Sequence, residues 1–282
     1  MSNPQQTQSV QKFTEAMNLY ESKVFPDLLK EHEISAAKYK HIVLSEFKRN
    51  PDLISAYVDN PMSLFASILF FAEIGLSPDS GLGEAYLIPY RGQKGYEIKP
   101  IIGYHGIIKV LLRSAGVKFV ETNCVFDGDT FEYELGLKPL LRHIPNHEVE
   151  RSSKTFKYAY AVAELDNGKT IFRVMSKSEI EKVRDMAKFT NKLFFNDVKD
   201  PNFWMPQKTV LKQLSKLLPK DFYGSKAIQY DNAVEGGASL SLDDQNGVKV
   251  IEGTPVKPQR YRNIYATIND EATIEVADSQ EQ

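Results

Sequence analysis

Basic and aromatic side chains are interleaved along residues 90–113, a combination typical of surfaces that bind single-stranded nucleic acid. Lysine and arginine neutralise backbone phosphates, and an aromatic face stacks on an unpaired base with a gain of about 1–3 kcal/mol. A solvated hairpin with core tyrosines would give the same pattern, so the pattern alone leaves both interpretations open. The candidate DNA contacts in this stretch are Arg91, Lys94, Lys99, Tyr104, His105, Lys109 and Arg113.

Lysines also recur every four residues in a second stretch, which is predicted to be a helix over residues 208–218. At this spacing Lys208, Lys212 and Lys216 lie on one face of the helix. Almost no acid is interleaved with them, whereas a solvated helix face usually mixes glutamate with lysine. An anionic ligand explains this stripe better than solvent does.

Three residues upstream of the stripe complete the candidate set. Lys188 and Lys192 extend the basic region, and Trp204 is a candidate for stacking, although a core position explains the tryptophan equally well. All these basic stretches are expected to meet in one groove, where they would hold phosphates without reading sequence.

The charge distribution supports a polyanionic partner only mildly. The chain of 282 residues has a net charge of -2, but residues 231–282 carry ten acids against four bases. The remaining body is therefore weakly basic. A single cysteine, Cys124, leaves no internal disulfide framework and suits a reducing cytosol. No N-terminal secretion signal is expected, and the longest apolar run, near residues 64–71, is too short to span a bilayer.

The chain is expected to form an α+β fold in three regions. Residues 1–60 form a helical N-terminal region, disordered up to residue 11, whose apolar faces suggest a role in oligomerisation. Residues 61–226 form the DNA-binding core, and residues 227–282 form a flexible acidic tail. Within that tail, the segment 260–268 carries Tyr261, Ile264, Tyr265 and Ile268, which suggests a short element that docks on another surface.

The core is predicted to be an antiparallel β-meander with inserted and flanking helices. Helices are expected over 62–74, 107–115 and 208–218, and strands over 84–90 and 96–102. Strands over 117–125 and 130–135 flank the turn Asp127-Gly128-Asp129, which predicts a hairpin. A second hairpin joins residues 158–165 to 170–175. Ser176 and Glu179 then form a capping box at the start of a further helix.

Signals for covalent chemistry are weak. The sequence has no glycine-rich loop ending in Gly-Lys-Ser/Thr, so nothing points to ATP or another cofactor. His143 and His147 are close in sequence but have no third ligand nearby for zinc. Asp127, Asp129, Glu132 and Glu134 leave open a metal-dependent nuclease, although a turn and an exposed strand face explain them better. A sequence-specific nucleic-acid-binding regulator is a second alternative, but nothing in the sequence resembles a recognition-helix module.

Five ordered blocks resemble the RecT family of phage single-strand annealing proteins. They are SLFASILFFAEIGLSPDSGLGEAYLIPY (63–90), IIGYHGIIKVLLRSAG (101–116), DGDTFEYELG (127–136) with the following His143-Ile144-Pro145, YAYAVAELDNGKTIFRVMSKSEIEKVR (158–184) and KTVLKQLSKLLP (208–219). One position departs from the family pattern, because Gln207 stands where the family tends to have a lysine. This puts a role for a lysine at 207 in doubt.

The resemblance implies ATP-independent binding of single-stranded DNA and annealing of complementary strands in phage-type recombination, without covalent chemistry, cofactor or metal. It also implies assembly into rings or filaments in the cytoplasm of a bacterial host. The implied partners are single-stranded DNA, the annealed duplex, further copies of the chain, a phage exonuclease and the host single-strand-binding protein, with no membrane.

Overall fold

Residues 4–59 form four helices, because apolar side chains recur there at helical spacing. These are α1 (Pro4–Lys23), α2 (Phe25–Leu29), α3 (Ala36–Arg49) and α4 (Pro51–Asp59). The computed structural model describes residues 4–92, 95–114, 116–186, 194–235, 238–243 and 247–251. The helical character of this region is confirmed. The expected disorder up to residue 11 is wrong from Pro4 onward, because Phe13 and Met17 are buried and hold α1 in place.

The chain divides into two units. The first contains the residues up to Ile101 together with those from Ala238 onward, and the second contains Ile102 to Gly237. Residues 61–101, which the sequence grouped with the core, therefore cluster with the N-terminal helices. The apolar faces of those helices close the core of their own unit, where Tyr20 stacks on Phe65 at 5.3 Å between ring centroids. Their burial explains these apolar faces within the unit, and a role of residues 1–60 in oligomerisation stays a prediction.

Helix α5 (Pro61–Glu73) is the centre of the first unit and is buried nearly all round, as its composition predicts. Asn60 caps it by accepting a hydrogen bond from the Ser63 amide at 3.2 Å. Strands β1 (Ala85–Gly92) and β2 (Gly95–Ile102) form a two-stranded sheet in this unit. A second pair, β8 (Ser239–Asp243) and β9 (Gly247–Ile251), contacts α5.

The second unit is built on a three-stranded antiparallel sheet in the order β3 (Val117–Phe126), β6 (Phe156–Leu165), β7 (Thr170–Ser176). Thr122 pairs with Ala161, and Ala161 pairs with Arg173. The predicted hairpin of β6 and β7 is confirmed, as is the capping box at α7 (Lys177–Met186), where the Ser176 amide donates to Glu179 at 2.8 Å.

The α+β class is confirmed, but the strands do not follow a simple meander. Strand β4 (Thr130–Glu134) pairs with β5 (Leu140–Ile144) and not with β3, so the turn at residues 127–129 joins two sheets and closes no hairpin. The physical reason is Asp129, whose buried carboxylate binds the Phe126 and Asn146 amides and so turns the chain away from β3.

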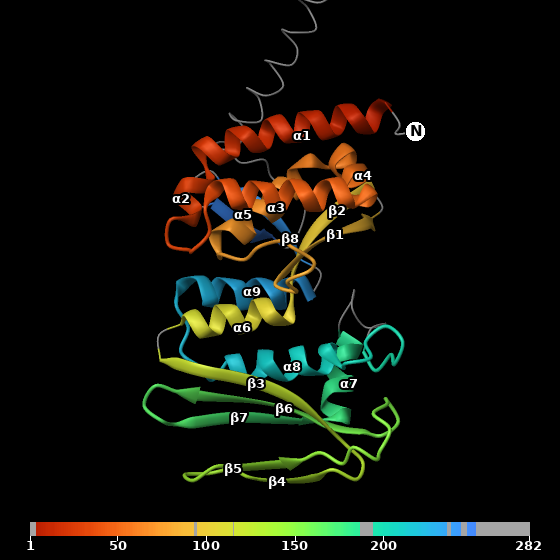
Figure 1. The fold of residues 1–282 in the computed structure, drawn as a ribbon, viewed down its shortest axis with the longest axis vertical. Coiled ribbons are helices and arrows are strands. Elements are labelled where there is room, and N and C mark those ends of the chain that lie inside the picture. The colour runs from red at the N-terminus through yellow and green to blue at the C-terminus, as the bar shows by residue number, and fades with distance from the viewer. Residues whose placement is uncertain are drawn as a thin grey trace, which may run out of the picture. The chain divides into compact units, whose positions relative to one another are not determined.

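The two faces of the three-stranded sheet are covered differently (Figure 1). Helix α8 (Trp204–Ser215) packs on one face, and the β4–β5 hairpin lies on the other. Phe131 of the hairpin stacks on Tyr158 and Tyr160 at 5.7 and 5.6 Å between centroids. Helices α6 (Tyr104–Arg113) and α9 (Phe222–Glu235) pack together and complete the unit.

Several boundaries differ from the sequence expectation. Helix α8 begins four residues earlier than predicted. Most of α9 and all of β8 and β9 lie within residues 227–282, which composition assigned to the tail. The described chain therefore extends in regular elements to Ile251, while the segment 260–268 lies outside the described residues. Among the described helices, none alone is long and apolar enough to cross a membrane, although α4 and α5, bent by 115°, pass the test of length and composition as a pair.

Candidate nucleic-acid interface

The candidate residues fall in both units. Arg91 and Lys99 belong to the first unit, and Lys94, Lys188 and Lys192 lie outside the described residues. The second unit holds the rest, namely Tyr104, His105, Lys109, Arg113, Trp204, Lys208, Lys212 and Lys216. The single groove expected from the sequence thus stays a prediction, and each unit is described by itself.

Three aromatic rings meet where α6 and α8 begin. Trp204 lies 5.0 Å from Tyr104 and 5.7 Å from His105, measured between ring centroids. Tyr104 and His105 lie 5.1 Å apart. Trp204 is 40% exposed, His105 is exposed and Tyr104 is half-buried. We call these three residues the aromatic cluster, which presents ring faces at the surface of the second unit.

A directed chain of hydrogen bonds holds Tyr104 in place. The Thr122 hydroxyl donates to Gln207 Oε1 at 2.8 Å, and this hydrogen bond uses the only proton of the hydroxyl. The Tyr104 hydroxyl must therefore donate to Thr122 Oγ1, also at 2.8 Å. Gln207 Nε2 donates in turn to the Asn202 carbonyl at 2.8 Å. Burial raises the pKa of Tyr104, only partly offset by the bond to Thr122, and this keeps the phenol a neutral donor.

Gln207 and Thr122 were not selected from the sequence. Gln207 was noticed only as a departure from the family pattern, and its role depends on an oxygen that accepts the Thr122 proton. A lysine has no acceptor for this bond. The departure at 207 therefore has a structural consequence, which is a fixed orientation for Tyr104.

The start of α8 is fixed by Asp200, which the sequence reading also missed. Its carboxylate accepts hydrogen bonds from the Trp204 and Met205 amides at 2.8 and 2.9 Å. Phe203 precedes the helix with φ of 55°, a left-handed conformation that is unusual for a bulky residue. The buried Phe203 ring packs against Phe126 and Phe156 at 5.2 and 5.7 Å. Trp204 is thus presented from an anchored helix end.

Basic side chains continue from the aromatic cluster along α6. His105, Lys109 and Arg113 follow one another at intervals of four residues, so they lie on one side of the helix. The other side is buried through Ile107 and Leu111. Lys109 and Arg113 are partly exposed. We call His105, Lys109 and Arg113 the basic face of α6.

The lysine stripe of α8 is not a surface feature along its whole length. Lys208 and Lys212 are buried, and Asp231 of α9 lies between them. The Lys208 ammonium is 3.0 Å from Asp231 Oδ1, and the Lys212 ammonium is 2.8 Å from Oδ2. Burial alone would raise the pKa of Asp231, but the two ammonium groups hold it below its usual range.

The inference that no acid offsets this stripe is therefore wrong. The compensating carboxylate comes from another helix, 23 residues beyond Lys208, where spacing within α8 gives no sign of it. Lys216 does lie at the surface, where its ammonium donates to Gln213 Oε1 at 2.9 Å. Of the three stripe lysines, Lys216 alone is placed to reach a ligand from outside.

The two described candidates of the first unit also differ in exposure. Arg91 is exposed, and its guanidinium lies 5.9 Å from the centre of the Tyr96 ring. Lys99 is buried, and its ammonium donates to the Ala238 carbonyl at 3.1 Å. This bond links β2 to the residues before β8, so Lys99 is used inside the unit.

Two of the four carboxylates that suggested a nuclease, Asp127 and Asp129, are engaged by protein groups. The side chain of Asp129 is fully buried and accepts two hydrogen bonds from Arg151, at 3.2 and 3.1 Å, and one from His143 at 3.1 Å. Burial would raise the pKa of Asp129, but these donors and two backbone amides lower it to about 2. Asp127 pairs with Lys157 at 2.8 Å. Within the described ranges, no group of three or more His, Cys, Asp or Glu is arranged to hold a metal.

Comparison with known proteins adds family evidence to this geometry. The sequence model of the RecT family matches residues 38–244. Protein RecT of Escherichia coli K12 is 32% identical over 208 residues, which cover 70% of this chain and 72% of that protein. The uncharacterized protein YqaK of Bacillus subtilis 168 is 31% identical over 158 residues, which cover 54% of this chain and 50% of that protein. The family match includes the aromatic cluster, the basic face of α6 and Asp231.

Proposed function

This chain belongs to the RecT family of recombination and annealing proteins, and on that premise we propose that it binds single-stranded DNA and anneals complementary strands without ATP. The observation that carries the proposal is the aromatic cluster at the start of the basic face of α6. Ring faces beside cationic side chains are the elements of a sequence-tolerant single-strand site.

The proposed roles follow exposure. Tyr104, His105 and Trp204 stack on bases or sugars, and Lys109, Arg113 and Lys216 hold phosphates. Such contacts leave the pairing edges of the bases free. Arg91, Lys94, Lys188 and Lys192 remain candidate phosphate contacts. Lys99, Lys208 and Lys212 act instead inside their units, because each is buried against a protein acceptor.

Annealing requires no fuel under this proposal, because pairing of complementary strands is favourable by itself. The protein reduces the repulsion between the two phosphate backbones and keeps the strand extended. No bond is made or broken, so the chain acts without covalent catalysis. Both oxygens of the Asp129 carboxylate accept hydrogen bonds from Arg151, which favours this proposal over a nuclease centred on residues 127–134.

A site that holds few nucleotides binds weakly, so we propose that copies assemble along the strand and share it. Head-to-tail contacts of this kind give closed rings or open filaments. The partners proposed beyond DNA are further copies, a phage exonuclease that makes single strands and a host single-strand-binding protein.

The single tryptophan of the chain gives a direct test. Oligothymidine is titrated while tryptophan fluorescence is followed, and binding is measured independently by anisotropy of labelled DNA. Stacking on Trp204 predicts saturable quenching that tracks the anisotropy. Affinity should fall with salt, with a log–log slope of about −0.7 per phosphate contact. Binding without any fluorescence change would remove Trp204 from the site, and no binding at low salt would contradict the proposal.

A further inference from the structure

Thr122 of β3 and Gln207 of α8 connect the two helices that carry the aromatic cluster. The Tyr104 hydroxyl donates to Thr122 Oγ1, and the Thr122 hydroxyl donates to Gln207 Oε1, both at 2.8 Å. Gln207 Nε2 donates to the carbonyl of Asn202, which stands two residues before Trp204. The hydrogen bonds thus begin at one ring of the cluster, on α6, and end beside the start of the helix that carries another.

Only one arrangement of protons fits these hydrogen bonds. A backbone carbonyl can only accept, so the Gln207 nitrogen faces Asn202 and the Gln207 oxygen faces Thr122. The Thr122 hydroxyl gives its proton to that oxygen, which leaves its lone pairs for the Tyr104 hydroxyl. Because each group has one fixed role, the network favours a single orientation of the Tyr104 ring before any ligand binds.

Neither Thr122 nor Gln207 is placed to bind DNA directly. Thr122 is only 5% exposed. Gln207 is half-buried, and both ends of its amide are hydrogen-bonded within the unit. Tyr104, in contrast, is half-buried beside the exposed ring of Trp204, at 5.0 Å between centroids. Any effect of the two polar residues on binding therefore passes through the position of the Tyr104 ring.

We propose that Thr122 and Gln207 are positioning residues, which hold Tyr104 ready to stack and so raise the affinity for single-stranded DNA without touching it. The inference rests on the proposed function, since it assumes that the aromatic cluster stacks on the strand. A ring that is already ordered loses less freedom on binding, and ordering one flexible side chain weakens affinity by about two- to tenfold. The chemistry needed is specific, because position 122 must both accept and donate a hydrogen bond.

Anisotropy titrations of labelled oligothymidine with variants of the full chain test the proposal. Thr122→Val keeps the shape of the side chain and removes the hydroxyl, so affinity should fall by about two- to tenfold. Thr122→Ser retains the hydroxyl and should recover most of the affinity. Tyr104→Phe keeps the ring and removes the same hydrogen bond, so it should weaken binding by a similar factor. The double variant with Thr122→Val should bind no more weakly than either single variant.

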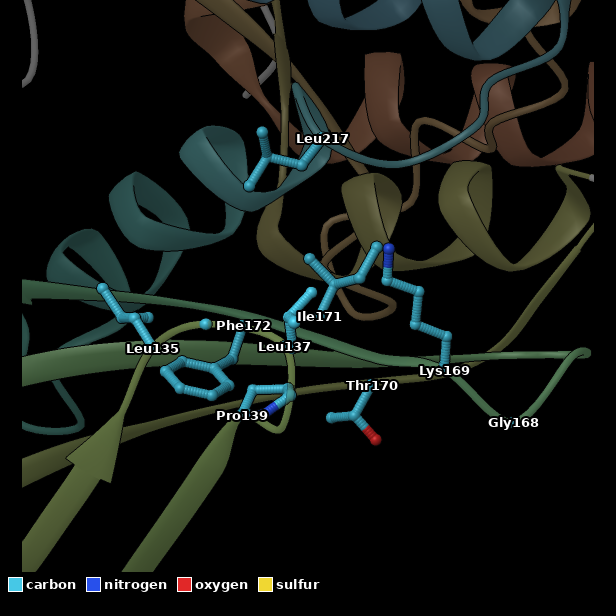
Figure 2. Close-up of a pocket in the computed structure, with 10 residues that line it drawn as sticks. Leu135, Leu137, Pro139, Gly168, Lys169, Thr170, Ile171, Phe172 and Leu217 are labelled. Carbon is cyan, nitrogen blue, oxygen red and sulfur yellow. The ribbon is translucent and has the colours of Figure 1, made fainter.

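Thr170→Val is the matched control for the exchange of threonine by valine. Thr170 is exposed on β7 and lines an open groove of about 710 Å³ that shares no lining residue with the network (Figure 2). Its exchange should leave the affinity unchanged. Thr122→Val should also keep the log–log salt slope of the parent, because no phosphate contact is lost. Thermal unfolding checks that each variant is folded at the temperature of the titration.

The expected result is weaker binding of Thr122→Val and Tyr104→Phe, with losses that do not add and that Thr122→Ser avoids. Equal affinity of Tyr104→Phe and the parent would overturn the inference and leave the proposed function intact. Additive losses in the double variant would also overturn it, because Thr122 would then act by another route. Gln207→Met, which removes both the acceptor and the donor, should match Thr122→Val, and an unchanged affinity would exclude a role for Gln207. A parent chain that does not bind at low salt would contradict the proposed function itself.

Discussion

Asp231 and Lys212 form a buried ion pair with 2.8 Å between the carboxylate and the ammonium. Lys208 shares the same carboxylate at 3.0 Å, so one acid serves two bases on α8. The two ion pairs connect α9 to α8. Lys208 and Lys212, two of the three lysines predicted to bind a ligand, therefore pair with a carboxylate inside the unit. This pairing separates the two buried lysines from Lys216, which lies at the surface.

Replacing Asp231 by asparagine is predicted to destabilise the protein by about 3–5 kcal/mol, because two buried ammonium groups lose their counter-charge. Urea unfolding measures this change. Asp185→Asn is the control, since Asp185 pairs with Arg184 at an exposed site and should cost at most about 1 kcal/mol. Equal effects of the two substitutions would contradict the buried role of Asp231.

The pKa of Asp129, lowered to about 2, predicts a specific acid sensitivity. A carboxylate with a folded pKa below its unfolded value of about 3.9 stabilises the fold above pH 4, and this contribution is lost as pH falls toward 2. The shift corresponds to about 2.6 kcal/mol. Unfolding free energies measured from pH 6 to pH 2 should therefore decline less steeply in Asp129→Asn than in the parent chain. An unchanged pH dependence would show that Asp129 does not provide the effect.

Trp204→Ala is predicted to weaken binding of oligothymidine by about 1–3 kcal/mol, through loss of one stacking face. Trp204→Phe should recover much of the affinity, because an aromatic face remains. Both variants should remain folded. Trp204→Ala should lose some stability, because the ring packs on Tyr104 and His105, and Trp204→Phe should lose less. Anisotropy titrations and thermal unfolding give the two readouts. Equal affinity of the alanine variant and the parent would exclude stacking on Trp204.

Lys109→Ala and Arg113→Ala are predicted to make the salt dependence of binding shallower, each by about 0.7 in the log–log slope. Lys212→Ala serves as a contrast, since it removes a buried partner of Asp231 and should act on stability first. Anisotropy titrations at several salt concentrations measure the slopes. A contradicting result would be a shallower salt dependence of binding for a fully folded Lys212→Ala variant, with no change for Lys109→Ala and Arg113→Ala. Lys212 would then be the phosphate contact, and the two α6 residues would not.

The sequence predicted well where the signal was local. The β6–β7 hairpin follows from alternation around Asp166-Asn167-Gly168, and the capping box follows from the spacing of Ser176 and Glu179. Helix α5 follows from its cap at Asn60 and its continuous apolar run. Each of these features depends on neighbours within a few residues, so no tertiary information is needed to find them.

The errors arose where a distant residue decides the outcome. Whether Lys212 faces solvent depends on Asp231, and whether β4 pairs with β3 depends on contacts made by Asp129 with Asn146 and Arg151. The aromatic cluster was predicted residue by residue, but its assembly from α6 and α8 was not. Periodicity within one element carries no information about which element covers it.

The most direct test of annealing uses two complementary labelled oligonucleotides mixed with the protein in the absence of ATP and divalent metal. Energy transfer between the labels reports pairing over time. The proposal predicts pairing faster than the protein-free rate, with the acceleration reduced in Trp204→Ala. A rate equal to that of the protein-free mixture, for a folded protein that binds each strand, would contradict annealing as its function.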